Sequence, residues 1–236
     1  MSEKYGIDVS TAQGVIDWDK LAAIDDLSFV IIRAAQGTAT DSRFAENIKE
    51  CQRVGIPYGL YFAASATTEQ DVRQEAAFAV DFFCDLYRPQ YGAWYDMELA
   101  KHKALGKAKI TELLRLWLEY VSGEGYRSGI YTNKDWLDNR IDHALLANYD
   151  LWYAAYPSTA RKALTDAPRD NRQKLSYPQA AIWQWSSAGR IDGINGNVDL
   201  NVCYAEFDAA KESKGYITLD DARTLIKNMG YDGISI

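Results

Sequence analysis

Four acidic residues lie in short apolar segments of the chain, close to the loops that follow or precede them. Asp8 falls near the end of the first segment, Asp96 and Glu98 close the fourth, and Asp199 lies in the last. In a closed barrel of parallel strands, the carboxyl ends of the strands and their loops converge on one mouth. We therefore expect the four carboxyl groups to meet at a single rim.

Asp96 and Glu98 have the spacing of a catalytic pair. Side chains two residues apart on a strand point to the same face, which puts their Cα atoms roughly 6.5 Å apart at a rise of about 3.3 Å per residue. Burial and repulsion between the charges raise the pKa of at least one carboxyl group of such a set. One protonated carboxyl beside one carboxylate is what cleavage of a glycosidic bond requires. The spacing falls between the retaining and inverting ranges, so it leaves the stereochemistry open.

Each acid has a simpler interpretation when it is taken alone. An Asp-x-Glu at a strand end is more often a helix cap, a salt-bridge partner or a metal ligand than a catalytic pair. Asp8 could cap the next segment, and Asp199 could be a turn residue after Asn195. A Mg²⁺ site made of carboxylates is also open, because hard cations accept such ligands. Four acids at predicted strand ends favour the hydrolase.

Motifs of other enzyme classes are absent from the sequence. It has no G-x-S-x-G elbow, no Walker loop, no G-x-G-x-x-G after a strand and no H-E-x-x-H. The two histidines, His102 and His143, do not favour a histidine-based triad or a zinc site. We interpret His102 as an exposed loop residue and expect neither a cofactor nor a metal ion.

The elements that must position the acids follow a βα pattern. Predicted strands are apolar segments rich in Val, Ile, Tyr and Trp, at residues 5–10, 29–35, 57–64, 92–99, 128–133, 151–156, 181–186 and 197–202. Helical periodicity is clearest over 110–121, and further helices are predicted over 68–86, after a capping-box-like Thr67-x-x-Gln70, and over 134–146. Five βα units followed by three strands predict an α/β fold closed as a TIM-like barrel. A doubly wound open sheet is the alternative, but it would need more helices in the last third.

Aromatic residues accompany the acids in the predicted strands. Tyr61, Trp94, Tyr131, Trp152, Trp183 and Trp185 all fall there. Most are expected in the core, because barrel strands are buried on both faces. Tyr61 and Tyr131 precede strand ends, which makes them the better candidates for contact with a sugar ring.

The composition and charge of the chain exclude some classes of binding partner. The 236 residues carry 33 acidic and 26 basic side chains, a net charge of −7, so no basic surface for nucleic acid is expected. No segment approaches the roughly 18 apolar residues of a membrane span. Cys51, Cys84 and Cys203 show no disulfide or zinc spacing and indicate a reducing compartment. The N-terminus lacks signal-peptide features, so we expect synthesis in the cytoplasm.

The last residues differ from the rest. We predict a main domain over 1–207 and a tail over 208–236 of unknown role, too short to form a domain. Leu219, Ala222, Leu225 and Ile226 predict a short amphipathic helix in this tail.

Over residues 5–207 the sequence resembles the glycoside hydrolase family 25 lysozymes, which are N-acetylmuramidases found in phage endolysins and secreted bacterial hydrolases. The resemblance rests on eight motifs in the family's order: Gly6-Ile7-Asp8-Val9-Ser10 with Gln13-Gly14, Phe44 with Asn47, Gly55-Ile56-Pro57-Tyr58-Gly59-Leu60-Tyr61, Tyr95-Asp96-Met97-Glu98, Gly129-Ile130-Tyr131-Thr132-Asn133, Leu151-Trp152-Tyr153-Ala154, Ile182-Trp183-Gln184-Trp185 and Gly196-Asn197-Val198-Asp199-Leu200-Asn201.

This resemblance implies a (β/α)5(β)3 barrel that hydrolyses the β-1,4 bond between N-acetylmuramic acid and N-acetylglucosamine in peptidoglycan. Glu98 matches the general acid, and Asp96 matches either the nucleophile or the residue that orients a substrate N-acetyl group. Candidate substrate-binding residues are Asp8, Asp199, Tyr61, Tyr131, Trp152 and Gln184. Release of a phage lysin through a holin would explain how a protein without a signal peptide reaches the cell wall.

The chain departs from the family after the second strand. Where the family often has Lys-x-Ser/Thr-Glu-Gly, this chain has Arg33-Ala34-Ala35-Gln36-Gly37. A cation is kept while a carboxylate becomes an amide, so we expect altered substrate contacts on that side.

Overall fold

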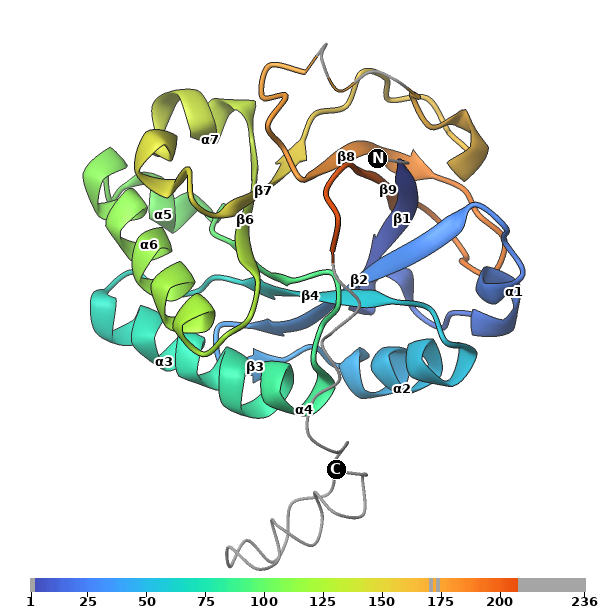
Figure 1. The fold of residues 1–236 in the computed structure, drawn as a ribbon, viewed down its shortest axis with the longest axis horizontal. Coiled ribbons are helices and arrows are strands. Elements are labelled where there is room, and N and C mark those ends of the chain that lie inside the picture. Colours follow the sequence, from blue (N-terminus) through green and yellow to red (C-terminus); the bar gives the residue numbers. More distant parts are fainter. Residues whose placement is uncertain (1–2, 170–171, 173–174, 208–236) are drawn as a thin grey trace, which may run out of the picture.

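Eight strands close into a barrel in the computed structural model, which describes residues 3–169, 172 and 175–207 (Figure 1). The barrel strands are β1 (Lys4–Val9), β2 (Leu27–Gln36), β4 (Tyr58–Ala63), β5 (Ala93–Asp96), β6 (Ser128–Asn133), β7 (Asp150–Ala154), β8 (Ile182–Gly189) and β9 (Val198–Cys203). β1 pairs with both β2 and β9, and this closes the sheet. The predicted TIM-like barrel is confirmed and the open doubly wound sheet is wrong. The two-residue β3 (Ala39–Thr40), which was not predicted, extends β2 as an antiparallel edge.

The last strand runs against the others. Strands β1 to β8 of the barrel pair in parallel, whereas β9 is antiparallel to both β8 and β1. The short connection between β8 and β9 holds no helix, and a parallel crossover needs a dozen or more residues. Asp199 therefore stands near the beginning of its strand, yet it is paired with Asp8 near the end of β1.

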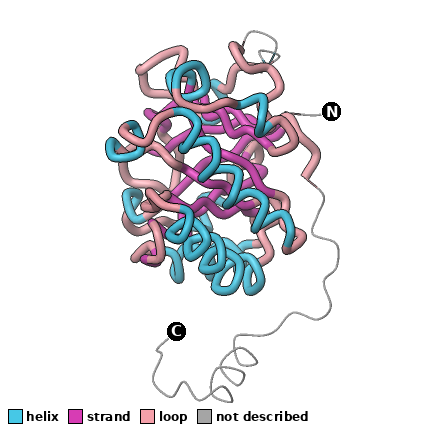
Figure 2. Tube along the Cα trace, turned by 90° about the vertical axis from the view of Figure 1, so that its left-hand side faces the viewer, coloured by secondary structure: helices cyan, strands magenta, loops and turns pink. Residues whose placement is uncertain are grey.

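Helices surround the first five barrel strands (Figures 1 and 2). They are α1 (Trp18–Ala22), α2 (Phe44–Val54), α3 (Glu69–Ala79), α4 (Asp85–Tyr87), α5 (Ala100–Lys103), α6 (Lys107–Gly123) and α7 (Lys134–Asn139), with a π turn η2 (Val80–Cys84) and 3₁₀ turns η1 (Thr11–Gln13), η3 (His143–Leu146) and η4 (Leu164–Asp166). The five βα units followed by three strands agree with the prediction.

Two helix predictions need correction. The predicted helix over 134–146 is divided, since α7 ends at Asn139 and a separate 3₁₀ turn follows. The N-cap of the helix after β4 is Thr68 and not the proposed Thr67, because the Thr68 side chain accepts the hydrogen bond from the Asp71 backbone N–H and α3 starts at Glu69. The η2 turn then interrupts this helix.

Strand residues alternate between two cores. Outward side chains such as Ile7, Val30 and Leu60 pack under the helices in one large cluster. Inward side chains form a second cluster made of Phe29, Ile31, Tyr91, Trp94, Trp152, Ala181, Ile182, Cys203 and Phe207, with Tyr61 and Tyr131 partly buried against it. This alternation follows the period of two residues in a strand. The barrel interior beneath the rim is therefore filled with apolar side chains.

Glycines make room for the large rings inside the barrel. A Cβ atom on Gly6 would lie 2.5 Å from the ring of Phe29, and one on Gly129 would lie 2.5 Å from the ring of Trp94. Both glycines occupy motifs of the sequence resemblance. Their lack of a side chain is thus a packing requirement of the barrel core.

In the part of the chain that the structure describes, no helix has the length and apolarity to cross a membrane. The predicted helix near Leu219 lies outside the described residues, so the division at 207 stays a prediction.

Gly129→Ala is expected to lower the free energy of unfolding by about 1–3 kcal/mol, the usual effect of overpacking a core. The new Cβ would also lie 2.5 Å from the backbone oxygen of Asp150, which has little freedom to move. Urea denaturation measures this, with Gly123→Ala as the control, because nothing lies within 4 Å of that Cβ at the end of α6. Equal stability of the Gly129 variant and the wild-type protein would contradict the packing argument.

Candidate active site

The barrel brings the four predicted acids together at one rim. Asp8 and Asp199 are directly paired on neighbouring strands, and the amide of Gln184 donates to both carboxylates, at 2.8 and 3.4 Å. Asp96 is the last residue of β5, and the charges of Glu98 and Asp8 both raise its pKa. The convergence expected from the sequence is therefore present.

Glu98 reaches this rim by a different route from the one expected. The strand β5 ends at Asp96, so Glu98 lies in the following loop and its direction is not set by the strand pleat. Its Oε1 atom accepts hydrogen bonds from Thr132 at 3.1 Å and from Asn133 at 2.9 Å, both at the end of β6. The Asn133 side chain also caps α7 by accepting from the Trp136 backbone N–H. The start of α7 therefore fixes the Asn133 side chain that holds Glu98.

Two amide side chains hold Asp8. Its Oδ2 atom accepts hydrogen bonds of 2.8 Å from Gln184 and 2.8 Å from Asn201. The indole N–H of Trp152 donates to Asn201 Oδ1 at 2.8 Å, so the amide nitrogen of Asn201 must face Asp8. Gln184 is oriented in the same way, because its Oε1 accepts from two hydroxyl groups, those of Tyr131 at 2.8 Å and Tyr156 at 2.5 Å. Aromatic donors therefore set the direction of both amides.

Asp8 and Asp199 each affect the protonation of the other. Burial raises the pKa of both carboxyl groups, and the charge and hydrogen bond of Asp8 raise that of Asp199 further. The two amide donors favour the charged form of Asp8, so they partly oppose the rise in its pKa that burial causes. Asp199 is therefore the member of the pair that keeps a proton to higher pH.

Asp96 and Glu98 are both shifted toward neutral pH, in an order that the sequence did not indicate. Burial, followed by the charges of Glu98 and Asp8, raises the pKa of Asp96 to about 8. Burial raises the pKa of Glu98 to about 6, and the hydrogen bond from Thr132 opposes it. No donor among the described residues makes a hydrogen bond to the side-chain carboxyl group of Asp96. Asp96 therefore holds its proton more strongly than Glu98.

Arg33 is a site residue whose role the sequence did not reveal. Burial raises the pKa of Asp96 and of Tyr61, and the positive charge of Arg33 partly opposes this rise. Its Nε atom donates to Asp41 Oδ2 at 2.6 Å, and the Asp41 side chain is fully buried. The signal in the sequence was a cation within an apolar strand, at the start of the Arg33-to-Gly37 departure.

The candidate aromatic residues divide into two levels. Tyr61 and Tyr131 are partly buried and pack edge-on against Trp152, with ring centroids 6.0 and 4.7 Å away. Trp152 is 1% exposed and Gln184 is 2% exposed, so both lie beneath the surface that a substrate would touch. Tyr156 is 43% exposed and was not among the predicted site residues. Its place directly before a proline at the end of a predicted strand was the available signal.

His102 is not the exposed loop residue that was expected. It lies in α5, is fully buried, and its Nδ1 atom accepts a hydrogen bond of 3.1 Å from the backbone N–H of Leu99. Burial lowers its pKa, which favours the neutral ring. Over the described ranges, no group of three or more acidic, histidine or cysteine side chains is arranged to hold a metal ion.

A TIM-like barrel with neighbouring buried carboxyl groups on its rim is the arrangement expected of a barrel-type glycoside hydrolase. The family model described as glycosyl hydrolases family 25 matches residues 7–194. The chain belongs to this family, in agreement with the resemblance seen in its motifs.

Individual relatives support the same family. The chain is 25% identical over 214 residues to lysozyme M1 of Streptomyces globisporus, covering 83% of this chain and 66% of the lysozyme. The autolysin LytC of Streptococcus pneumoniae, solved with a synthetic peptidoglycan ligand, is 25% identical, with a TM-score of 0.71 over 86% of this chain. The chain spans 47% of that autolysin. The catalytic domain of the Listeria phage endolysin ply40, 24% identical, shares the fold with a TM-score of 0.65 over 86% of this chain and 94% of its own.

Asp96→Asn should make the protein more stable, and increasingly so as the pH rises. The pKa of an unfolded aspartate is about 3.9, whereas that of folded Asp96 is about 8. The folded state thus binds the extra proton between these values, and its stability falls as the pH rises from about 4 to about 8. Asparagine cannot ionise, so the variant should gain little at pH 4.5 and about 2 kcal/mol or more at pH 8.

Urea denaturation at several pH values measures this difference in the free energy of unfolding. The matched control is Asp192→Asn at an exposed position. A stability gain that is the same at pH 4.5 and pH 8 would show that Asp96 is not a strained buried acid.

Proposed function

We propose that this chain hydrolyses the β-1,4 bond between N-acetylmuramic acid and N-acetylglucosamine in the glycan strands of bacterial peptidoglycan. The observation that carries the proposal is the pairing of Asp96 and Glu98 on one rim with pKa values of about 8 and about 6. Membership of family 25 supports it, as do the name of the Streptomyces lysozyme and the peptidoglycan ligand of the Streptococcus autolysin.

Glu98 is the proton donor in this proposal. A carboxyl group with a pKa near 6 can protonate the departing sugar oxygen while the anomeric carbon gains oxocarbenium character. The bonds from Thr132 and Asn133 hold the Oε1 atom, which leaves Oε2 to carry the proton. Glu98 becomes a carboxylate after the transfer, and these same two donors stabilise that product state.

Asp96 is proposed as the partner that stabilises positive charge, either as the nucleophile or by orienting the N-acetyl group of the substrate. With a pKa of about 8, its carboxyl group is mostly protonated at neutral pH. A substrate amide N–H would supply the hydrogen-bond donor that Asp96 lacks among the described residues, and a donor favours the carboxylate form. Substrate binding would thus move the single proton of the pair to Glu98. This requirement favours the N-acetyl-assisted route.

The other rim residues are proposed to bind sugar or to orient those that do. Asp8 and Asp199 offer carboxyl oxygens to sugar hydroxyl groups, while Tyr61 and Tyr131 offer partly buried ring edges and hydroxyl groups. Trp152 and Gln184 act beneath them as positioning residues. These roles are part of the proposal, as are synthesis in the cytoplasm and release through a holin. The likeness to the ply40 domain shows a shared fold and supports no residue role.

Glu98→Gln is expected to reduce kcat for release of reducing ends from purified peptidoglycan by at least about 100-fold, the usual contribution of a general acid. The amide keeps the hydrogen bond from Asn133 or Thr132 and should leave binding of the glycan close to normal. Mass spectrometry of the wild-type products should find muramic acid at the new reducing end.

Other outcomes of this experiment identify the rival functions. N-acetylglucosamine at the reducing end would indicate another specificity, and preferred cleavage of chitin would indicate a chitinase-like enzyme. Binding of peptidoglycan without any release of reducing ends would indicate a barrel that only recognises the wall. A Glu98→Gln variant that retains the wild-type rate would refute the acid role.

The rate should depend on pH as a bell. Catalysis needs one proton on the Asp96–Glu98 pair, and the pair loses its protons near pH 6 and near pH 8. The value of kcat/KM should therefore fall on both sides of this window. Thr132→Val removes a hydrogen bond that favours the Glu98 carboxylate, so the lower limb should move up by about one unit. If the lower limb stays in place, Glu98 is not the group whose ionisation sets it.

A further inference from the structure

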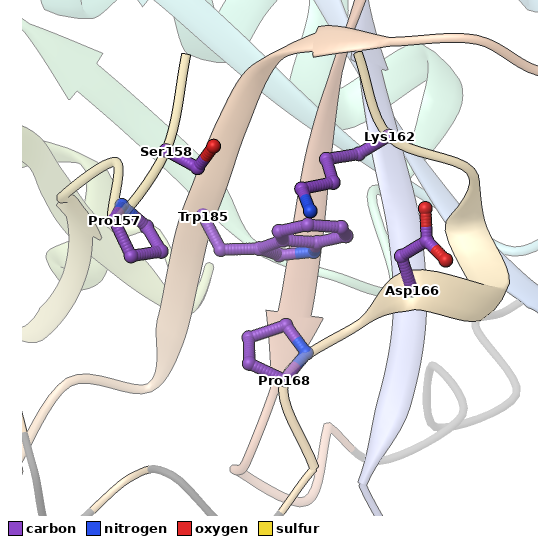
Figure 3. Close-up of a pocket in the computed structure, with 6 residues that line it drawn as sticks. All are labelled: Pro157, Ser158, Lys162, Asp166, Pro168 and Trp185. Atoms are coloured by element: carbon purple, nitrogen blue, oxygen red, sulfur yellow. The ribbon is translucent and has the colours of Figure 1, made fainter. Parts of the chain in front are cut away.

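A cavity of about 220 Å³ lies on the outer side of β8, apart from the carboxyl groups. It is lined by Pro157, Ser158, Lys162, Asp166, Pro168 and Trp185 (Figure 3). In Figure 3 the indole of Trp185 occupies the centre, with Lys162 and Pro168 on opposite sides of it. The lining therefore combines an aromatic floor with one cationic and one anionic group.

The segment between β7 and β8 builds this cavity in place of a covering helix. Lys162 is fixed by its backbone, which donates to Ala188 at 3.2 Å and accepts from Arg190 at 2.7 Å. Asp166 closes the adjoining turn by accepting from the Ala163 backbone N–H at 2.8 Å. The charged side chains thus start from a backbone that is anchored to the end of β8.

Two groups in the lining lack partners of their own. Within the described ranges, no carboxylate lies within ion-pair distance of the Lys162 ammonium. The indole N–H of Trp185 is buried and finds no acceptor among the same residues. An orphaned buried donor calls for an explanation, and an acceptor brought by a ligand supplies one.

Two residues that line the cavity are sequence neighbours of residues in the candidate active site. Pro157 follows Tyr156, whose hydroxyl group donates to Gln184, and Trp185 follows Gln184 directly. Gln184 faces the carboxyl groups, so Trp185 faces the opposite side of the same strand. A ligand held at the rim would need only to pass over the end of β8 to reach the cavity.

We propose that this cavity binds the carboxylate end of the short peptide stem that muramic acid carries, an inference that rests on the proposed function. Lys162 makes a charge-assisted hydrogen bond to the carboxylate, and Trp185 with the two prolines packs against a small apolar side chain. The cavity is smaller than the roughly 300 Å³ typical of sites for drug-sized ligands, so it suits one or two small residues. Four extended residues span about 13 Å, and Gln184, which bonds to Asp8, is next in β8 to Trp185, which lines the cavity.

A binding measurement tests this without any need for catalysis. Isothermal titration compares a soluble peptidoglycan stem peptide that has a free C-terminal carboxylate with the same peptide amidated at that end. The wild-type protein should bind the free carboxylate about 3- to 10-fold more tightly, the effect of one partly exposed charged hydrogen bond. Lys162→Met should abolish this preference.

Arg161→Met is the matched control, because it removes one positive charge from the neighbouring, exposed position of the same segment. This variant should keep the preference for the carboxylate. Equal affinity of the wild-type protein for both peptides, binding of neither, a preference that survives in the Lys162 variant, or its loss in the Arg161 variant would each overturn the proposal.

A kinetic comparison separates this inference from the proposed function. Glycan strands that carry stems and strands stripped of stems by an amidase are both digested. Lys162→Met should raise KM about 3- to 10-fold for the strands with stems and leave the stripped strands unaffected. An equal change on both substrates, or none on either, would overturn the inference. A wild-type protein that cleaves neither substrate would refute the proposed function, and the peptide titration would then decide the inference alone.

Discussion

Burial of four neighbouring carboxyl groups is the constraint on which the rest of this structure depends. Each of Asp8, Asp96, Glu98 and Asp199 loses hydration at the rim, and burial is the largest cause of every one of their raised pKa values. Such groups cannot all be charged together. The protein must therefore control which of them carries a proton, and it does so with hydrogen-bond donors.

Those donors are placed by elements far away in the sequence. Glu98 is held by β6, and Asp8 is held by amides from β8 and β9, whose directions Trp152, Tyr131 and Tyr156 set. The aromatic layer thus has two tasks, since it fills the barrel and its polar atoms orient the amides above it. Asp96 receives no such help from the described residues, which explains why its pKa is the higher of the catalytic pair.

The sequence was sufficient for the barrel and for the convergence of the acids on one rim. Short apolar segments rich in Val, Ile, Tyr and Trp predict the strands, and local helical periodicity predicts α6. It could not show that Glu98 lies beyond β5, or that β9 is antiparallel, because both depend on how separate segments meet. The Glu98 partners lie 34 and 35 residues away, and Asn201 lies 193 residues from Asp8, so no local pattern encodes these bonds.

The apolar packing beneath the rim explains why the fold can keep a buried carboxyl group there without a hydrogen-bond donor. Beneath it Phe29, Tyr91 and Phe207 stack, with centroids 4.4 and 5.2 Å apart, and glycines such as Gly6 let the rings fit. This packing stabilises the barrel independently of the carboxyl groups, so the fold tolerates a destabilising charge cluster at its mouth. A ligand that donates a hydrogen bond to Asp96 would relieve part of that strain. Recognition and proton placement would then arise from one contact, because the donor that binds the substrate also leaves the proton to Glu98.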